Sequence, residues 1–237
     1  IQRGIKRMKE LFLNTPAMLF LTIGSYLVGL YCKTKSGFSL LHPFIICIPI
    51  IIVTLQITGI SCKEYMECNK IITFLLGPCV VSLGLSLYDN LEVIKKNALA
   101  ILSSIIVGSI AGVGSVYLLC KWMDLDELFA QSLVSKSVTT PIAMDLTESL
   151  GGNISLTAVS VVLCGFIGAV IGPVLWKAFR FKHPVARGLA MGCASHGLGT
   201  ARAIEMGAVE GAISGLSIAL MGIATALIIP LYSYLTT

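Results

Sequence analysis

The sequence has few charged side chains, and this shortage limits the classes of protein it can encode. Asp, Glu, Lys and Arg make up 12% of the 237 residues, whereas 56% are hydrophobic and the mean hydropathy is +0.90. A water-soluble domain of this composition would lack the polar side chains needed to cover its surface. The composition therefore excludes a soluble globular domain and predicts an integral membrane protein in contact with lipid. The net charge of +5 is small, so we expect no nucleic-acid partner.

Recognisable motifs for metal, nucleotide or covalent chemistry are also missing. Most of the eight cysteines lie in apolar stretches, where they are expected to pack as small hydrophobic residues, and the three histidines are scattered along the chain. Neither a Walker A motif nor a Gly-x-Gly-x-x-Gly motif after a strand occurs. Ser195 and His196 are neighbours in sequence, which does not arrange a serine nucleophile and its base. We therefore expect no metal, no cofactor and no enzymatic activity.

Long stretches without charge dominate the sequence. Six of them can each hold one membrane-spanning helix of roughly 20 residues: 11–32, 36–62, 71–88, 97–120, 149–176 and 211–237. Two further segments, 128–148 and 188–206, are apolar in part but contain charged side chains. The sequence therefore predicts an all-α, polytopic membrane protein with about eight hydrophobic elements, of which two are broken or re-entrant helices.

The distribution of Lys and Arg predicts an orientation. If all eight elements span and the N-terminus is cytoplasmic, eleven Lys and Arg residues lie inside and four lie outside, in agreement with the positive-inside rule. Without residues 1–7 the count is eight inside and four outside. Lys95 and Lys96 are counted outside in this eight-span topology, and a re-entrant segment nearby would place them inside.

We expect a single transmembrane domain over residues 1–237, in which residues 1–7 are a non-native leader before a start at Met8. Two halves, 8–122 and 123–237, would form an internal repeat of the transporter type. An inverted repeat would require a re-entrant element in each half.

The first polar segment, residues 135–145, reads Ser-Lys-Ser-Val-Thr-Thr-Pro-Ile-Ala-Met-Asp. Pro141 has no N–H and disfavours helical angles at the preceding residue, so we expect the helix to break near Thr139 and Thr140. In lipid the freed backbone groups require a buried or hydrated cavity. A half-helix that starts near Pro141 would direct its amides and the positive end of its dipole at that cavity, which favours an anion.

Lys136 and Ser137 precede this break and would add a positive charge and a hydroxyl to the same site. The alternative is that the Lys136 side chain extends to the membrane interface while the hydroxyls bond to the backbone of a kinked helix. Because intramembrane polar groups carry an insertion cost of a few kcal/mol, we favour a site for the cluster as a whole.

The second polar segment, Gly192–Glu205, combines small residues with polar ones. The small residues permit close backbone packing, and Arg202 and Glu205 can pair on one helix face. If residues 196–200 are helical, His196 and Thr200 share a face; a packing role for the histidine is the alternative to a role in proton transfer. The candidate ligand-binding residues of this segment are Ser195, His196, Gly199, Thr200 and Arg202.

At these two segments the sequence resembles the LrgB/CidB family of bacterial membrane proteins, to which the plastid glycolate/glycerate translocator is related through its C-terminal part. The resemblance rests on Lys136–Ala143 and Ala194–Ala203, and extends to Phe74–Pro78, Leu91–Asn97, Gly151–Ala158 and Val209–Ala212. Residue 197 is Gly where Ala is expected in many relatives. Nearly the whole chain is covered.

This resemblance implies a multi-pass protein of the bacterial inner membrane, with a holin-like LrgA/CidA-type membrane protein as partner. It also implies one of two functions. The first is transport of small carboxylates such as pyruvate or glycolate, and the alternative is antiholin-like regulation of murein hydrolase export and autolysis. We favour transport because an antiholin would not need the two polar segments, and we expect a homo-oligomer that binds a small carboxylate anion.

Overall fold

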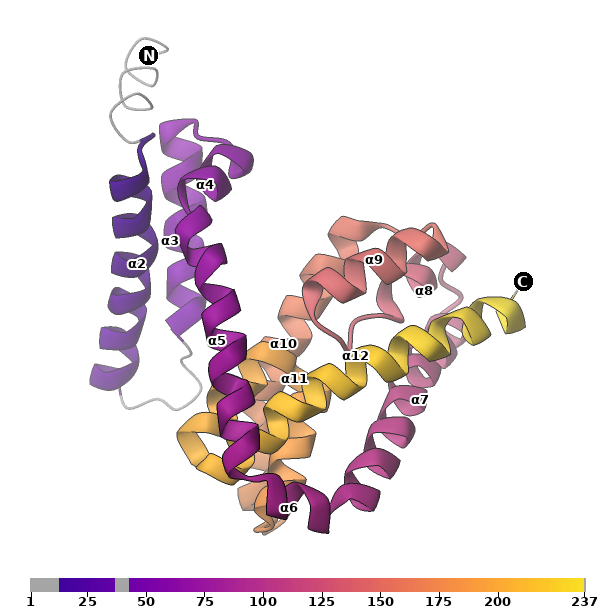
Figure 1. Ribbon diagram of the computed structural model, residues 1–237. Coiled ribbons are helices and arrows are strands. Elements are labelled where there is room, and N and C mark those ends of the chain that lie inside the picture. Colours follow the sequence, from indigo (N-terminus) through magenta and orange to yellow (C-terminus); the bar gives the residue numbers. More distant parts are fainter. Residues whose placement is uncertain (1–12, 37–42, 237) are drawn as a thin grey trace. The chain divides into compact units, whose positions relative to one another are not determined.

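The computed structural model describes residues 13–36 and 43–236, and these residues form helices joined by short turns, as predicted (Figure 1). The expected leader, residues 1–7, lies outside the described residues. The helices are α2 (Thr15–Ser36), α3 (Pro43–Thr58), α4 (Cys62–Cys68), α5 (Lys70–Asp89), α6 (Leu91–Lys96), α7 (Ala98–Trp122), α8 (Glu127–Leu133), α9 (Thr140–Leu150), α10 (Ile154–Ala178), α11 (Pro184–Met206) and α12 (Ala208–Thr236).

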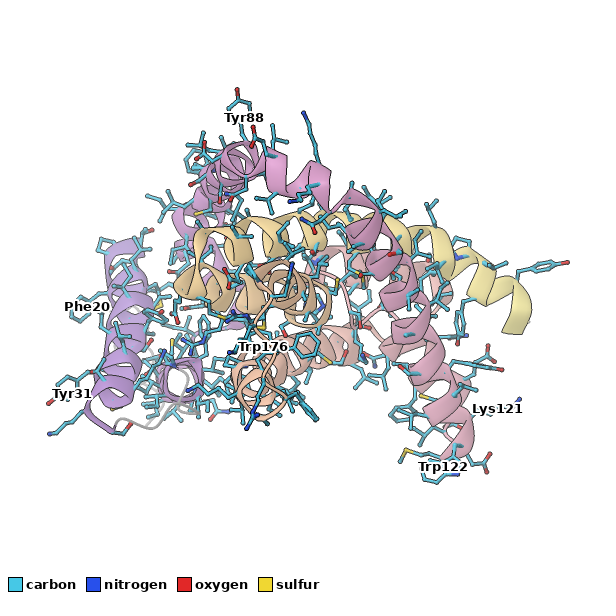
Figure 2. All side chains as sticks on the ribbon, turned by 90° about the horizontal axis from the view of Figure 1, so that it is seen from below. Phe20, Tyr31, Tyr88, Lys121, Trp122 and Trp176 are labelled. Carbon is cyan, nitrogen blue, oxygen red and sulfur yellow. The ribbon has the colours of Figure 1, made fainter. Side chains whose placement is uncertain are left out.

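Five of the six uncharged windows correspond to a long helix each. Within the described residues, α2, α5, α7, α10 and α12 are long and apolar enough to cross a membrane. The window 36–62 differs from the prediction, because α3 has only 16 residues and qualifies only together with α4, which is bent from it by 112°. Side chains such as Phe20, Tyr31 and Trp122 project outwards from the helices, as expected of surfaces that face lipid (Figure 2).

The chain forms two compact units, Ile1–Ser82 and Leu83–Thr237. In the first unit, α2 packs closely on α3, since a Cβ added at Gly29 would lie 2.4 Å from the carbonyl oxygen of Pro43. The Thr22 hydroxyl of α2 lies 2.6 Å from the Tyr65 hydroxyl of α4. The sharp bend before α4 follows Gly59, which has φ 67°, and Ser61 caps the new helix.

In the second unit, the first polar segment folds back on itself as a hairpin. We call Glu127–Leu150 hairpin 1: α8, a turn over 134–139, and α9. The Ser135 hydroxyl donates to the carbonyl oxygen of Ala143 at 3.1 Å and lies 2.8 Å from the Thr147 hydroxyl. The amide of Asn153, just beyond α9, donates to the Ser132 hydroxyl at 2.7 Å. These contacts bring the two arms together, with the tip at 139–141.

The second polar segment also reverses direction. We call Pro184–Met206 hairpin 2; its two helical arms meet at His196, which has φ 44° and ψ −124°. A Cβ added at Gly199 would lie 2.4 Å from the carbonyl oxygen of Met191, whereas eight residues of straight helix span roughly 12 Å. Ala203 of the second arm is buried in a cluster with Met191 of the first. Both predicted broken helices are therefore present, and each is a hairpin.

The two hairpins lie at opposite ends of α10 (Figure 1). Hairpin 1 ends just before the first residue of α10, and hairpin 2 begins shortly after the last. With 25 residues α10 is roughly 37 Å long, enough to cross a hydrocarbon core of about 30 Å. Hairpin 1 and hairpin 2 therefore enter the membrane from opposite faces.

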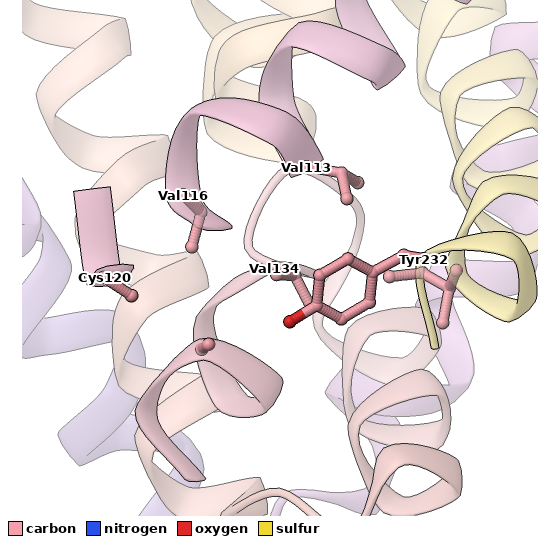
Figure 3. Close-up of a cluster of buried hydrophobic side chains, with 7 residues drawn as sticks. Val113, Val116, Cys120, Val134 and Tyr232 are labelled. Atoms are coloured by element: carbon pink, nitrogen blue, oxygen red, sulfur yellow. The ribbon is translucent and has the colours of Figure 1, made fainter. Parts of the chain in front are cut away.

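A buried apolar cluster holds the outer part of hairpin 1 against two spanning helices. Val113, Val116 and Cys120 of α7 pack with Val134 and with Tyr232 of α12 (Figure 3). The rings of Tyr117 and Tyr232 meet edge to face, with centroids 5.6 Å apart. This packing fixes hairpin 1 between α7 and α12.

Basic residues of the second unit gather on one face. Val93 and Ile94 of α6 pack on the cluster that contains Val185 and Leu189 of hairpin 2, so the ends of α6 and α10 share a face. Outside the membrane interior, that face carries Lys95, Lys96, Lys177, Arg180, Lys182, Arg187 and Arg202, and the opposite face carries Lys121. The positive-inside rule predicts that the first face is cytoplasmic.

This arrangement corrects the eight-span topology. That topology placed Lys121 inside with Lys177 because it treated 128–148 as a span, and it placed Lys95 and Lys96 outside because it counted three spans from a cytoplasmic N-terminus. Since 128–148 is a hairpin that returns to its own face, Lys121 lies opposite Lys177, and Lys95 and Lys96 lie on the cytoplasmic face. The two halves 8–122 and 123–237 stay a prediction; the pattern of a hairpin followed by a long helix occurs twice within 127–236.

We predict that cysteines introduced at Asp126 and Lys182 label from opposite sides. In a variant whose native cysteines are replaced, Asp126→Cys reacts with a membrane-impermeant maleimide in intact cells, and Lys182→Cys reacts only after permeabilisation. Both side chains are exposed. Labelling of both positions from the same side would contradict the re-entrant form of hairpin 1.

We further predict that Gly192→Ala destabilises the protein. A Cβ at Gly192 would lie 2.4 Å from the carbonyl oxygen of Ser214 and 2.6 Å from the Cβ of Ser217, so hairpin 2 would have to separate from α12. The expected cost is about 1–3 kcal/mol, measured as a lower unfolding temperature in detergent. Gly114→Ala is the matched control, because a Cβ there has no neighbour within 4 Å; equal unfolding temperatures for the two variants would contradict the close packing.

Candidate functional site

The tips of the two hairpins meet at a pocket. Its volume is about 260 Å³, and three elements line it: the start of α9, part of α10 and the tip of hairpin 2. The lining residues are Thr139, Thr140, Pro141, Val161, Val162, Gly165, Ser195, His196, Gly197 and Leu198. The α10 residues lie near the middle of that helix, so the pocket lies near the middle of the membrane.

The helix break at Pro141 supplies one wall of the pocket. Thr139 is extended, with φ −63° and ψ 150°, and α9 begins at Thr140 with Pro141 in its first turn, close to the predicted position. The Thr139 side chain makes no capping hydrogen bond to the helix. Within the described residues, the Thr139 and Thr140 hydroxyls have no hydrogen-bond partner at the open N-terminus of a helix, where backbone N–H groups and the dipole favour negative charge.

The reversal at His196 supplies the opposite wall. Ser195 and His196 are both buried, and both Ser195 Oγ and His196 Nε2 are buried atoms without a hydrogen-bond partner. The imidazole is hydrogen-bonded to the backbone of Ser137, which links the two hairpins. A positive φ costs a non-glycine residue of order 1–3 kcal/mol, and such strain is concentrated at binding sites. Two unpartnered polar atoms in one pocket are suited to bind a ligand with polar groups.

Lys136 supplies positive charge beside the pocket. Its Nζ donates to the Ser137 hydroxyl at 3.2 Å, and its charge acts on His196. Neither Lys136 nor Ser137 lines the pocket, but both lie immediately behind the tip residues. The lining residues include no carboxylate. The electrostatic environment therefore favours an anion.

Three predicted site residues lie elsewhere. Gly199 packs against Met191, and the Thr200 hydroxyl lies 2.7 Å from the Ser214 hydroxyl between hairpin 2 and α12. Arg202 forms an ion pair with Glu205 at the base of hairpin 2, as the spacing predicted. The prediction that His196 and Thr200 share a helix face is wrong, because His196 departs from helical angles.

The wall from α10 was not predicted. A Cβ at Gly165 would lie 3.3 Å from the Ser195 carbonyl oxygen, and one at Gly168 would overlap the Ser195 hydroxyl at 1.8 Å. These two glycines let the tip of hairpin 2 approach α10. The signal in the sequence is their three-residue spacing in an apolar helix, which places both on one face.

Hydroxyl groups hold hairpin 1 in position. Thr157 of α10 donates to the Ser132 carbonyl oxygen at 2.8 Å and lies 3.0 Å from the Thr147 hydroxyl, which also contacts Ser135. All four residues are buried. They provide hydrogen-bond partners for backbone and side-chain polar groups, which lipid cannot do. They also fix the start of α9 relative to α10.

Comparison with known proteins places the chain among bacterial membrane proteins. Residues 22–235 match the LrgB-like family. The relatives include proteins of Bacillus mycoides, Bacillus cereus and Bacillus anthracis, each named antiholin-like protein LrgB and each 36% identical over 209 residues, which cover 88% of this chain and 91% of the relative. No solved structure matches the chain significantly. The chain is therefore a multi-pass membrane protein that belongs to the LrgB-like family.

Proposed function

We propose that the protein transports small carboxylate anions across the bacterial plasma membrane and binds them in the pocket between the hairpin tips. The observation that carries this proposal is the meeting of two re-entrant hairpins, one from each face, near the middle of α10. Broken helices at this depth are found where they line a substrate cavity. A protein that acts only as a regulator would not need such a cavity.

The chemistry of the pocket supports an anion with a carboxylate and a second polar group. The N-terminus of α9 and the Thr139 and Thr140 hydroxyls would donate hydrogen bonds to the carboxylate, with Lys136 as countercharge. Ser195 Oγ would donate to a keto or hydroxyl oxygen on the opposite side, and His196 Nε2 would accept from a hydroxyl group of the ligand. The volume of about 260 Å³ is below the range of roughly 300–1,000 Å³ for drug-sized ligands, which favours a small acid such as pyruvate or glycolate.

The arrangement also provides a route to each face. Each tip closes the pocket towards one side of the membrane, and Val161, Val162 and Leu198 would exclude water from the bound anion. Movement of hairpin 1 away from α10 would open the pocket to the outside, and movement of hairpin 2 would open it to the cytoplasm. Alternating movement of the two would carry the anion across.

Antiholin-like regulation is the second candidate function, favoured by the name that the Bacillus relatives bear. In that case the chain would act through a partner, for which a holin-like membrane protein of the LrgA/CidA type is the expected candidate, and through its own oligomers. Transport and regulation are compatible if carboxylate flux controls autolysis.

We predict that purified protein in proteoliposomes takes up labelled pyruvate or glycolate, and that His196→Gly abolishes uptake while the protein still folds. Glycine adopts φ 44° without strain, so the hairpin reversal is retained while the imidazole is lost.

Thr140→Val should lower the apparent affinity for the carboxylate by about 10- to 100-fold, because one hydrogen bond to a charged group is lost. Ser103→Ala, at an exposed position on α7, is the control. Absence of uptake of every small monocarboxylate by the wild-type protein, with and without its partner, would refute transport.

The two functions differ in how autolysis depends on the pocket. If carboxylate transport underlies the lytic phenotype, cells that carry His196→Gly in place of the wild type show altered autolysis in parallel with lost uptake. Zymography of secreted murein hydrolases and the rate of detergent-induced lysis measure this effect. Wild-type lysis and hydrolase profiles in the His196→Gly strain would instead favour a regulator that acts independently of the pocket.

A further inference from the structure

A second pocket lies at the base of hairpin 2, at the end of this hairpin away from its tip. Its volume is about 410 Å³, and it opens where α10 ends and both arms of hairpin 2 return to the cytoplasmic face. Five basic side chains line it: Lys177, Arg180, Lys182, Arg187 and Arg202. This concentration of positive charge is not needed for the pocket between the tips.

Two of the five basic residues are already engaged within the protein. Arg187 donates to the carbonyl oxygen of Lys182 at 2.5 Å and lies 3.8 Å from the Glu210 carboxylate, and Arg202 pairs with Glu205. Lys177, Arg180 and the Lys182 ammonium make no ion pair with another described residue. The pocket therefore presents three uncompensated positive charges on a wall fixed by Arg187 and Arg202.

The same pocket has an aromatic and apolar side. Trp176 and Phe181 line it together with Pro173, and Trp176 projects from the C-terminal part of α10 (Figure 2). Tryptophan is enriched at membrane interfaces, where its ring lies at the level of the lipid headgroups. Beside the pocket, Leu175 and Phe179 are exposed on the surface of the helix. Positive charge is thus next to a surface that acyl chains would cover.

We propose that this pocket binds the phosphate headgroup of an anionic phospholipid from the cytoplasmic leaflet. Arg180 would bind the phosphate through paired N–H groups, and Lys177 and Lys182 would add charge. Basic pockets between membrane helices on the cytoplasmic side bind anionic headgroups in this way. The apolar path along α10 favours a lipid over a soluble phosphate compound, which has the same charged group but no acyl chains.

A lipid in this position would contact three segments at once. Lys177 belongs to α10, Arg180 and Lys182 to the connection that follows, and Arg187 and Arg202 to the two arms of hairpin 2. The bound headgroup would therefore hold the base of hairpin 2 against α10. This proposal does not depend on the substrate of the pocket between the tips.

The experiment uses Trp176 as a reporter. The chain has two tryptophans, so Trp122→Phe leaves Trp176 as the sole one. The Trp122→Phe protein is reconstituted in phosphatidylcholine vesicles that contain equal fractions of acyl-brominated phosphatidylglycerol or acyl-brominated phosphatidylcholine. We expect Trp176 fluorescence to be quenched several-fold more strongly by the brominated phosphatidylglycerol. In the reciprocal Trp176→Phe protein, Trp122 on the opposite face should be quenched equally by both lipids.

Substitutions distinguish lipid binding in the pocket from non-specific attraction of anionic lipids by all the basic residues of the cytoplasmic face. The combined Lys177→Gln, Arg180→Gln and Lys182→Gln variant should bind phosphatidylglycerol no better than phosphatidylcholine. We expect the binding preference for phosphatidylglycerol to fall about fivefold for each basic residue removed. Lys95→Gln with Lys96→Gln removes two charges from the same face outside the pocket and should leave the preference intact. Inorganic phosphate added to the vesicles that contain brominated phosphatidylglycerol tests the soluble alternative and should not displace the brominated lipid.

Equal quenching of Trp176 by the two brominated lipids in the Trp122→Phe protein would overturn the proposal without any pocket variant. A preference that the Lys95 and Lys96 substitutions abolish as completely as the pocket substitutions do would overturn it too, because the attraction would then belong to the whole face. Displacement by inorganic phosphate would assign the pocket to a soluble phosphate ligand instead of a lipid.

Discussion

The structure depends on the need to satisfy backbone polar groups inside a membrane. Lipid offers no hydrogen bonds, so a helix that breaks at bilayer depth is stable only where protein surrounds the break. The second unit breaks two helices, at Thr139 and at His196, and surrounds both breaks with α7, α10 and α12. The cost of the breaks is offset by hydroxyl pairs such as Ser135 with Thr147 and Thr200 with Ser214. The same breaks create the pocket.

Small residues make this enclosure possible. Gly188 and Gly192 of hairpin 2 leave no room for a Cβ against α12, and Gly168 leaves none between α10 and the hairpin tip; a Cβ at Gly165 would be in tight contact at 3.3 Å. Close backbone contact replaces the hydrophobic effect, which does not drive helices together in lipid. The two hairpins thereby share α10 as a common wall, and one site becomes accessible in principle from two faces.

Much of this arrangement follows from the sequence, and the remainder depends on contacts between distant segments. The uncharged windows predicted the long helices because length and hydropathy are local properties, and Pro141 predicted the break before α9 because its effect on Thr140 is local. A broken helix in 188–206 was predicted, but its reversal at His196 was not located, because the strained angles at this residue are imposed by packing. The displacement of Arg202 from the pocket follows from that reversal. The role of α10 as a wall of the pocket could not be predicted, because it depends on where the two hairpin tips pack against this helix.

If the protein is a transporter, the pocket between the hairpin tips is accessible from both faces of the membrane. Gly197 lines that pocket, and a Cβ there has no neighbour within 4 Å, so Gly197→Cys introduces a thiol without distortion. The decisive measurement is the rate at which a small charged methanethiosulfonate modifies this thiol from each side of sealed vesicles, with the native cysteines replaced. We predict modification from both sides and slower modification in the presence of the transported carboxylate. Modification from one side only, at a rate that no carboxylate changes, would contradict it.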